Sequence, residues 1–180
     1  MRKILSIIIL FLSTATLSAN DRDVELDKLF LELKKNIPSL SSGIAQQIWM
    51  LWSTHPTNQK LTSILDEGSR LVQDQQLNRA INVFSEAIEL DPTWAEAWNK
   101  RATVYFLMSQ FKNSLNDIDK VLVIEPRHFG ALSGQARIFI KLQEYEKAIK
   151  SIENALKFYP LFKSRELIPE IERLIREDSI

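Results

Sequence analysis

The sequence predicts an all-α protein built from stacked helical hairpins. Three prolines, Pro92, Pro126 and Pro160, are spaced 34 residues apart, and each closes a stretch whose apolar residues follow helical spacing. The chain of 180 residues has only four glycines and no glycine-rich tract, as expected for a helical chain. A constant period of this length indicates that one supersecondary unit is repeated and that neighbouring units share a continuous core.

Residues 1–19 precede the repeats and have a different character. Two basic residues are followed by an apolar run over residues 4–12 and then by small residues up to Ala19. This order is the layout of a secretory signal peptide, and we expect cleavage after Ala19 or Ser18. The folded part is therefore predicted to be periplasmic or secreted, without a stable membrane span after cleavage. The alternative is an uncleaved anchor, for which the uncharged stretch is marginal in length.

Residues 20–58 are predicted to form a helical hairpin ahead of the repeats. Apolar residues follow helical spacing over 26–37 and again over 44–52, with a proline and a polar stretch between them. Terminal units of a repeat array are often atypical because one face has no neighbour. We expect this hairpin to cap the first repeat, with Trp49 and Trp52 buried against it. If they are not buried, both are candidate binding residues.

Residues 61–94, 95–128 and 129–162 form three units in one register without insertions. Small residues at positions 8 and 20 of a unit let paired helices approach closely, while large residues at positions 4, 11 and 24 fill the space beside them. A proline at position 32 cannot continue the second helix. In the second unit, positions 4, 8, 11, 20, 24 and 32 are Trp98, Ala102, Tyr105, Ser114, Ile118 and Pro126.

This pattern resembles the tetratricopeptide repeat, which has the same period. The resemblance covers the three units and implies a right-handed superhelical solenoid of three helix-turn-helix repeats, with the N-terminal hairpin before them. Position 7, commonly leucine in this family, is polar in all three units, as Glu67, Arg101 and Gln135. The side chains of this polar row are either solvated or part of a functional surface.

Residues 163–180 are predicted to form a C-terminal capping helix that covers the third repeat. Their apolar residues follow helical spacing. Pro169 either kinks the middle of this helix or lies in the first turn of a helix that begins near it.

The resemblance also implies a concave groove, lined by the first helix of each repeat, that binds a peptide or helix of a partner protein. Asn99, Thr103 and Phe106 are predicted at its centre, and two flanking cations from the third repeat favour an acidic segment. A chaperone-tail clamp is not expected, because small or apolar residues occupy several of its positions. The implied groove residues are Leu65, Ser69, Val72, Asn99, Thr103, Phe106, Leu107, Ser133, Arg137, Ile140 and Lys141.

Composition and motifs narrow the class of function. The formal net charge is zero, which does not indicate a nucleic-acid partner, and the lack of cysteine excludes disulfides and thiolate metal sites. His55 and His128 have no carboxylate at a metal-ligand spacing, and no catalytic motif or phosphate-binding glycine loop is present. We therefore expect no enzymatic activity, no cofactor and no metal.

The leading hypothesis is a non-enzymatic interaction module of the bacterial periplasm. The alternatives are a self-associating structural protein of the envelope, and an enzyme or metal-binding protein with an unrecognised site. Trp94, at a position that is usually small and polar, either packs between the first two repeats or serves as a binding anchor. Residues 125–132 and the hairpin resemble exported repeat proteins, mainly alphaproteobacterial, whose role is unassigned.

Overall fold

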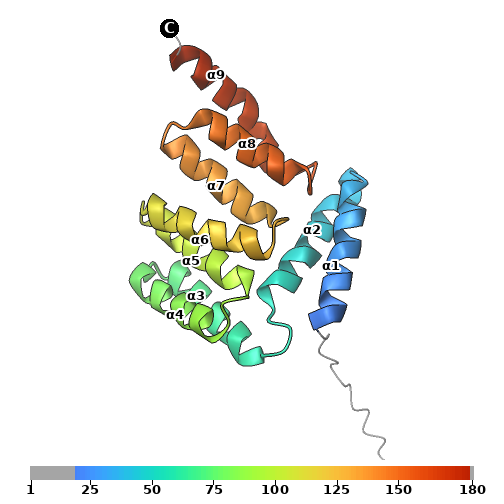
Figure 1. Cartoon of the computed structure of the whole chain (residues 1–180), viewed down its shortest axis with the longest axis vertical. Helices are drawn as coiled ribbons and strands as arrows, with labels where there is room; N and C mark the ends of the chain where they lie inside the picture. The colour runs from blue at the N-terminus through green and yellow to red at the C-terminus, as the bar shows by residue number, and fades with distance from the viewer. Residues whose placement is uncertain (1–18, 179–180) are drawn as a thin grey trace, which may run out of the picture.

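The computed structural model describes residues 19–178, and it confirms the all-α prediction (Figure 1). This part of the chain contains nine α-helices, one 3₁₀ helix and no strand. None of its helices combines the length and the apolar character that a membrane crossing requires. Apart from Ala19, the predicted signal peptide lies outside the described residues. The elements are α1 (Ala19–Lys34), α2 (Pro38–Ser53), α3 (Gln59–Gln73), α4 (Leu77–Leu90), α5 (Ala95–Leu107), α6 (Phe111–Ile124), α7 (Phe129–Lys141), α8 (Tyr145–Leu156), η1 (Lys163–Leu167) and α9 (Ile168–Asp178).

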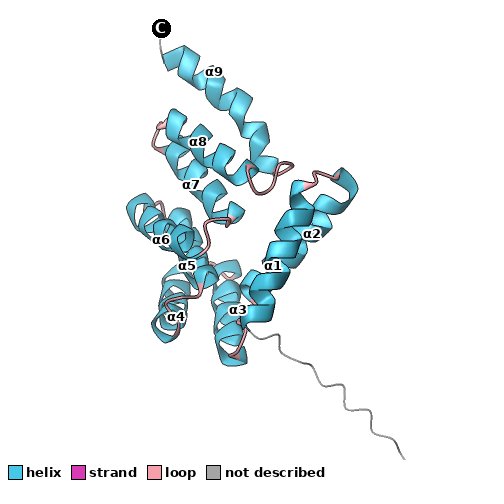
Figure 2. Ribbon diagram, turned by 45° about the vertical axis from the view of Figure 1, so that its right-hand side comes forward, coloured by secondary structure: helices cyan, strands magenta, loops and turns pink. Residues whose placement is uncertain are grey.

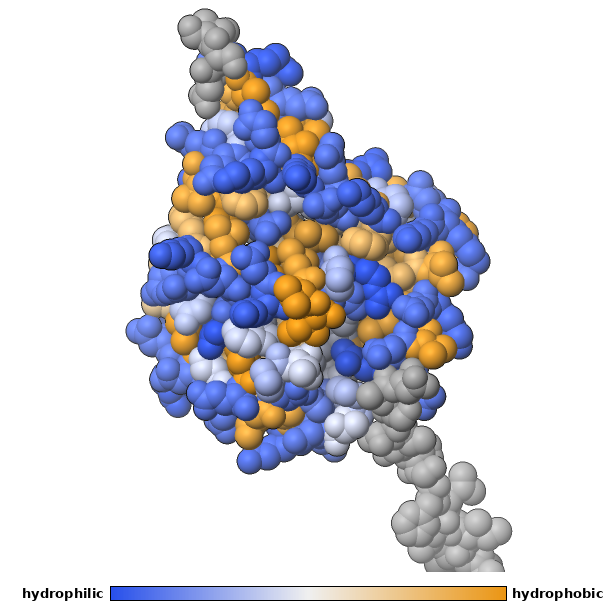
Figure 3. All heavy atoms as spheres, in the orientation of Figure 1, coloured by the Kyte–Doolittle hydropathy of each residue, from blue (hydrophilic) through white to orange (hydrophobic). Residues whose placement is uncertain are grey.

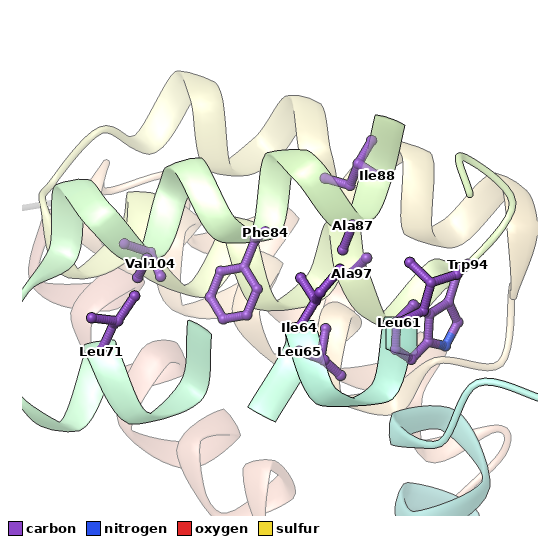
Figure 4. Close-up of a cluster of buried hydrophobic side chains, with 11 residues drawn as sticks. Leu61, Ile64, Leu65, Leu71, Phe84, Ala87, Ile88, Trp94, Ala97 and Val104 are labelled. Carbon is purple, nitrogen blue, oxygen red and sulfur yellow. The ribbon is translucent and has the colours of Figure 1, made fainter. Parts of the chain in front are cut away.

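The pairs α3–α4, α5–α6 and α7–α8 stack on one another as helix-turn-helix units (Figure 1). In the first unit, the ring of Phe84 on α4 fills the space beside Gly68 on α3, where an added Cβ would lie 2.3 Å from the ring. Figure 4 shows Phe84 in the middle of this core, between Leu71 and Ile64. The small residue at position 8 is therefore required by the large one at position 24, as the repeat pattern predicts.

In each repeat, the turn between the two helices has a residue with left-handed backbone conformation at the same position. Gln75, Ser109 and Gln143 have φ values of 59°, 58° and 60°. In the middle repeat the next amide, that of Gln110, donates a 2.8 Å hydrogen bond to the carbonyl of Tyr105, five residues earlier. This bond belongs to the Schellman motif that ends many helices, where glycine is the usual left-handed residue. The turns are thus built alike, but with side chains that disfavour their conformation.

We expect Ser109→Gly to stabilise the protein by about 0.5–1 kcal/mol, because glycine adopts a positive φ without the Cβ clash. Chemical denaturation of the purified protein measures this change. The matched control is Ser63→Gly on the exposed side of α3, where the same substitution in a helix interior should destabilise by about 0.5–1 kcal/mol. A loss of stability in both variants would contradict the assignment of strain to the turn.

The polar row at position 7 joins the two helices of a repeat. The guanidinium of Arg101 on α5 donates hydrogen bonds of 2.8 and 2.9 Å to Asp117 on α6, and one of 2.9 Å to Ser85 on α4. In the third repeat, Ser151 donates a 2.8 Å hydrogen bond to the side-chain oxygen of Gln135. The hydrogen bonds to Asp117 raise the pKa of Arg101 despite its partial burial. In these two repeats the row is structural, whereas Glu67 of the first repeat is exposed.

The N-terminal hairpin does not cap the first repeat, so that prediction is wrong. Helices α1 and α2 lie beside the stack of repeats in both views (Figures 1 and 2). Their apolar faces share a core with the start of α7, through Phe129 and Leu132, and with the segment after α8. The physical reason lies in the aromatic side chains at the repeat boundaries, because the ring of Phe129 packs against those of Phe30, Trp49 and Trp52 of the hairpin.

Trp52 is the main contact between the hairpin and the repeats. Its ring is stacked on that of His128, with centroids 4.0 Å apart and planes inclined by 10°, and only 2% of the residue is exposed. The indole of Trp94 donates a 2.8 Å hydrogen bond to the backbone carbonyl of Trp52. Trp94 is itself 3% exposed, so of its two predicted roles the structure shows packing.

Helix α1 is held by a second contact, at the turn between the second and third repeats. Arg127 places its guanidinium over the ring of Phe30, 4.5 Å from the centroid, and forms a 2.6 Å ion pair with Asp27. The same side chain is bonded to Glu125, whose hydrogen bonds raise the pKa of Arg127. Phe30 also packs against Phe129, at a centroid distance of 6.4 Å. Both hairpin helices are therefore fixed to the boundaries between repeats.

The C-terminal segment covers the end of the third repeat. Helix α9 buries Ile171 in a cluster with Ala148 and Ile152 of α8. Pro169 is the second residue of α9, so it lies in the first turn, and the preceding residues form η1. Of the two interpretations of Pro169, the one that places it at a helix start is confirmed.

We expect Trp52→Ala to destabilise the protein by about 3–5 kcal/mol, because it removes a buried aromatic ring from the contact between hairpin and repeats. Thermal denaturation measures the loss. Met50→Ala, two residues away and 60% exposed, is the control and should change stability by at most about 0.5 kcal/mol. Equal effects in the two variants would mean that the hairpin is an independent appendage.

Candidate functional site

A pocket of about 240 Å³ lies between α5 and α7. Most of the lining residues belong to α5, α6 and α7, and they are small or apolar apart from Asn99, Thr103, Ser114, Ser133 and Arg137. Two large rings from outside these three helices complete the wall. The lining residues are Trp49, Asn99, Ala102, Thr103, Phe106, Ser114, Ile118, Gly130, Ala131, Ser133, Gly134, Arg137 and Phe162.

Five of the predicted groove residues meet in this pocket: Asn99, Thr103, Phe106, Ser133 and Arg137. They come from positions 5, 9 and 12 of the second repeat and positions 5 and 9 of the third. Positions 5 and 9 are one helical turn apart, so they place side chains on the same face of α5 and of α7. The repeat register therefore predicts four of the five polar residues that line the pocket.

The remaining predicted groove residues lie elsewhere. Leu65 is 1% exposed and belongs to the core of the first repeat, because α5 packs against α3 there with Ala97 and Val104. Leu65 was expected to line an open groove, and the structure places it in the core instead. The others do not line the pocket: Ser69 and Val72 on α3, Leu107 at the end of α5, and Ile140 and Lys141 at the end of α7.

Asn99 is less available to a ligand than the sequence suggests. The residue is only 9% exposed, and its amide nitrogen donates a 3.0 Å hydrogen bond to the carboxylate of Glu96. Thr103 and Arg137 are exposed, although the hydroxyl of Thr103 donates to the backbone carbonyl of Asn99 at 2.9 Å. The mouth of the pocket is thus formed by Thr103 and Arg137, and Asn99 lies below it.

A buried pair beneath the pocket escaped the sequence analysis. His128 and Glu96 are both at most 1% exposed, and Nε2 of the imidazole lies 3.0 Å from a carboxylate oxygen. Nδ1 accepts the amide hydrogen of Ala131 at 3.1 Å, which caps the N-terminus of α7. Because Nδ1 accepts a hydrogen bond, the ring proton is assigned to Nε2, and this N–H group donates a hydrogen bond to the carboxylate of Glu96. The second carboxylate oxygen faces the ammonium of Lys100 at 3.4 Å, an ion pair without hydrogen-bond geometry.

The other histidine makes the same kind of contact at the preceding repeat boundary. His55 Nε2 lies 2.8 Å from a carboxylate oxygen of Asp91, and its Nδ1 accepts the amide hydrogen of Asn58 at 3.0 Å. Although burial opposes the change, hydrogen bonds from Thr93 and His55 lower the pKa of Asp91. Neither histidine belongs to a group of three potential metal ligands among the described residues. Both imidazoles therefore serve to fix the chain between helical units.

Trp49 and Phe162 bring the hairpin and the last turn into the pocket. Trp49 meets the rings of Trp52, His128 and Phe129 edge-on, at centroid distances of 5.4, 5.4 and 5.5 Å. Phe162 ends the third repeat, at the same position as Trp94 and His128 in the first two. A side chain with a ring stands at the last position of all three repeats. This regularity in the sequence could have predicted that the repeat boundaries pack through rings.

The comparisons with known proteins agree with this architecture. The family described as TPR repeat matches residues 68–109, and the family described as tetratricopeptide repeat matches residues 130–160. A TPR repeat-containing protein of the alphaproteobacterium Rhizobium etli is 37% identical over 136 residues, which are 75% of this chain and 66% of the relative. A tetratricopeptide repeat and J domain-containing co-chaperone of Cryptococcus neoformans is 29% identical over 139 residues. That match covers 77% of this chain and 25% of the co-chaperone.

Solved structures share the fold at lower sequence identity. The first TPR of Spaghetti, bound to an HSP90 peptide, superposes with a TM-score of 0.62 at 21% identity, covering 66% of this chain and 94% of that one. The Sgt2 TPR domain of Aspergillus fumigatus superposes with a TM-score of 0.63 at 17% identity, covering 68% and 83%. The paired helices and the pocket between the first helices of two repeats define a helical-repeat protein. This chain belongs to the tetratricopeptide repeat proteins.

Two glycines of α7 should respond in opposite directions to the addition of one methyl group. A Cβ at Gly130 would lie 2.4 Å from the indole of Trp49, so Gly130→Ala should destabilise the protein by about 1–3 kcal/mol. A Cβ at Gly134 would lie 3.7 Å from Ile118, an ordinary contact, so Gly134→Ala should stabilise α7 by about 0.5–1 kcal/mol. Urea denaturation compares the two variants. The same sign in both would contradict the position of Trp49 against α7.

Proposed function

We propose that this protein is a non-enzymatic interaction module of the periplasm, and that it binds a segment of a partner protein in the pocket between α5 and α7. The observation that carries the proposal is the meeting of five predicted groove residues in one pocket between α5 and α7. Tetratricopeptide arrays use such surfaces to contact other proteins, and the peptide bound to the first TPR of Spaghetti is one example.

The chemistry of the pocket suits a peptide better than a small polar substrate. Its lining combines small and apolar side chains with the hydroxyl groups of Thr103 and Ser133 and the guanidinium of Arg137. Such a lining can bury an apolar side chain and still hydrogen-bond to the backbone or the neighbouring polar groups of the same segment. A peptide or helix, the ligand expected from the repeat family, offers both an apolar side chain and backbone polar groups to such a lining.

The proposed location rests on the leader sequence. Because cleavage is expected after Ala19 or Ser18, the mature chain should begin at Asn20 or Ala19 and should fractionate with the periplasm. The intact mass of the exported protein measures the start of the chain directly. Recovery with membranes at a mass that retains residues 1–18 would contradict cleavage and would indicate an anchor.

A photo-reactive amino acid placed in the pocket tests the proposed binding site. Incorporation at Thr103, which is exposed at the mouth, should give an adduct with a partner protein when living cells are irradiated. The matched control is Val123 on α6, which is 81% exposed but does not line the pocket. Adducts from Val123 and none from Thr103 would move the binding surface away from the groove.

Self-association is a second candidate, favoured by apolar residues exposed on the hairpin. Leu31, Leu40 and Met50 are 64%, 51% and 60% exposed. Apolar surface also gathers in the middle of the face shown in Figure 3, between polar regions. Placing the photo-reactive amino acid at Met50 distinguishes the two functions. Self-association predicts that irradiation gives an adduct of twice the mass of the chain from this position.

A further inference from the structure

Two aromatic side chains from outside α5, α6 and α7 form walls of the pocket. Trp49 comes from the hairpin and Phe162 from the turn after α8. Phe162 is held by Phe129 and Tyr159, with ring centroids 5.2 and 5.3 Å away. Trp49 is held by three rings of the aromatic cluster described above. These contacts fix both walls before any ligand arrives, so the pocket is preformed.

Gly134 leaves space in the pocket that the fold does not need. Gly130, by contrast, has no room for a side chain, because Trp49 occupies that space. Gly134 has a negative φ and only one neighbour, Ile118, within 4 Å of an added Cβ, so neither backbone conformation nor packing requires glycine there. Glycine inside a helix is nevertheless unfavourable. Because Gly134 lines the pocket, a large side chain at this position would occupy part of the cavity.

The size of the cavity fits one large apolar side chain. A protein cavity of about 150 Å³ lined by apolar side chains accommodates benzene. The pocket has about 240 Å³, with Phe106, Ile118 and Trp49 among its apolar lining residues. A phenylalanine, leucine, methionine or tryptophan side chain can therefore enter it, whereas a charged side chain would lose its hydration against these walls.

Arg137 supplies a charge beside this apolar space. It is exposed at the mouth of the pocket and forms no ion pair with any of residues 21–177. The carboxylate below the pocket, that of Glu96, is already engaged by His128 and Lys100. A ligand that brings a carboxylate close to its apolar side chain would therefore meet an unpaired cation.

We propose that the pocket selects a partner segment in which a large apolar side chain is followed or preceded, within two residues, by aspartate or glutamate. The apolar side chain fills the space above Gly134 between Trp49 and Phe106, and the carboxylate pairs with Arg137. This assignment rests on the proposed function, since it names the ligand of the same pocket. It requires no free C-terminus, because Arg137 is the one charged residue among the described residues that line the pocket, and a guanidinium pairs equally well with a side-chain carboxylate.

A displayed library of random dodecapeptides, selected on the protein without residues 1–19, tests the assignment. The wild type should enrich a large apolar residue with an acidic one within two positions. Arg137→Glu should keep the apolar enrichment and lose the acidic one, whereas Gly134→Leu, which fills the cavity, should lose the apolar enrichment. Circular dichroism confirms that each variant is folded, and Gly134→Ala serves as the folded control with a smaller side chain.

A synthetic consensus peptide makes the test quantitative. Replacing its carboxylate by the amide should weaken binding to the wild type about tenfold and leave binding to Arg137→Gln unchanged, as a double-mutant cycle requires for a direct pair. Enrichment of basic residues, or equal loss of affinity in both proteins, would overturn the assignment while leaving a groove-binding function. Adducts from Val123 and none from Thr103 would instead overturn the function itself.

Discussion

The stacking of Trp52 on His128 is the contact on which the arrangement of this molecule depends. His128 caps the N-terminus of α7 and is hydrogen-bonded to Glu96 of α5. Its imidazole ring stacks on the indole of Trp52 of α2. One buried residue therefore joins two neighbouring repeats to the hairpin. The rings around His128 pack edge-on and face-on, and this packing fixes the position of the hairpin relative to the repeats. The position of the hairpin in turn places Trp49 at the wall of the pocket.

The repeats could be predicted from sequence because their contacts are local and periodic. The pair formed by Gly68 and Phe84 recurs in kind every repeat, so residue type at a fixed spacing determines which helices touch. The position of the hairpin could not be predicted in this way. Its apolar stripe fits any apolar surface, and the deciding contacts, such as Asp27 with Arg127, join residues 100 positions apart. Amphipathic spacing indicates which face of a helix is buried but not what covers it.

The same distinction applies to the pocket. Thr103 and Arg137 were predicted from their repeat positions, since those positions set the side of the helix on which a side chain lies. The engagement of Asn99 depends on the buried pair of Glu96 and His128, and the presence of Trp49 depends on the hairpin. Both are consequences of tertiary packing, which overrides an expectation based on one helix face. The wall of the pocket is thus composed of residues from the repeats and from the hairpin.

The central claim is that the hairpin forms part of the binding pocket, and fluorine NMR of the protein labelled with 5-fluorotryptophan tests it most directly. The chain has four tryptophans, whose signals can be assigned by single substitution to phenylalanine. Addition of the consensus peptide should shift the signal of Trp49 and leave that of the buried Trp94 unchanged. Saturation by the peptide with no change at Trp49 would contradict a pocket shared between the hairpin and the repeats.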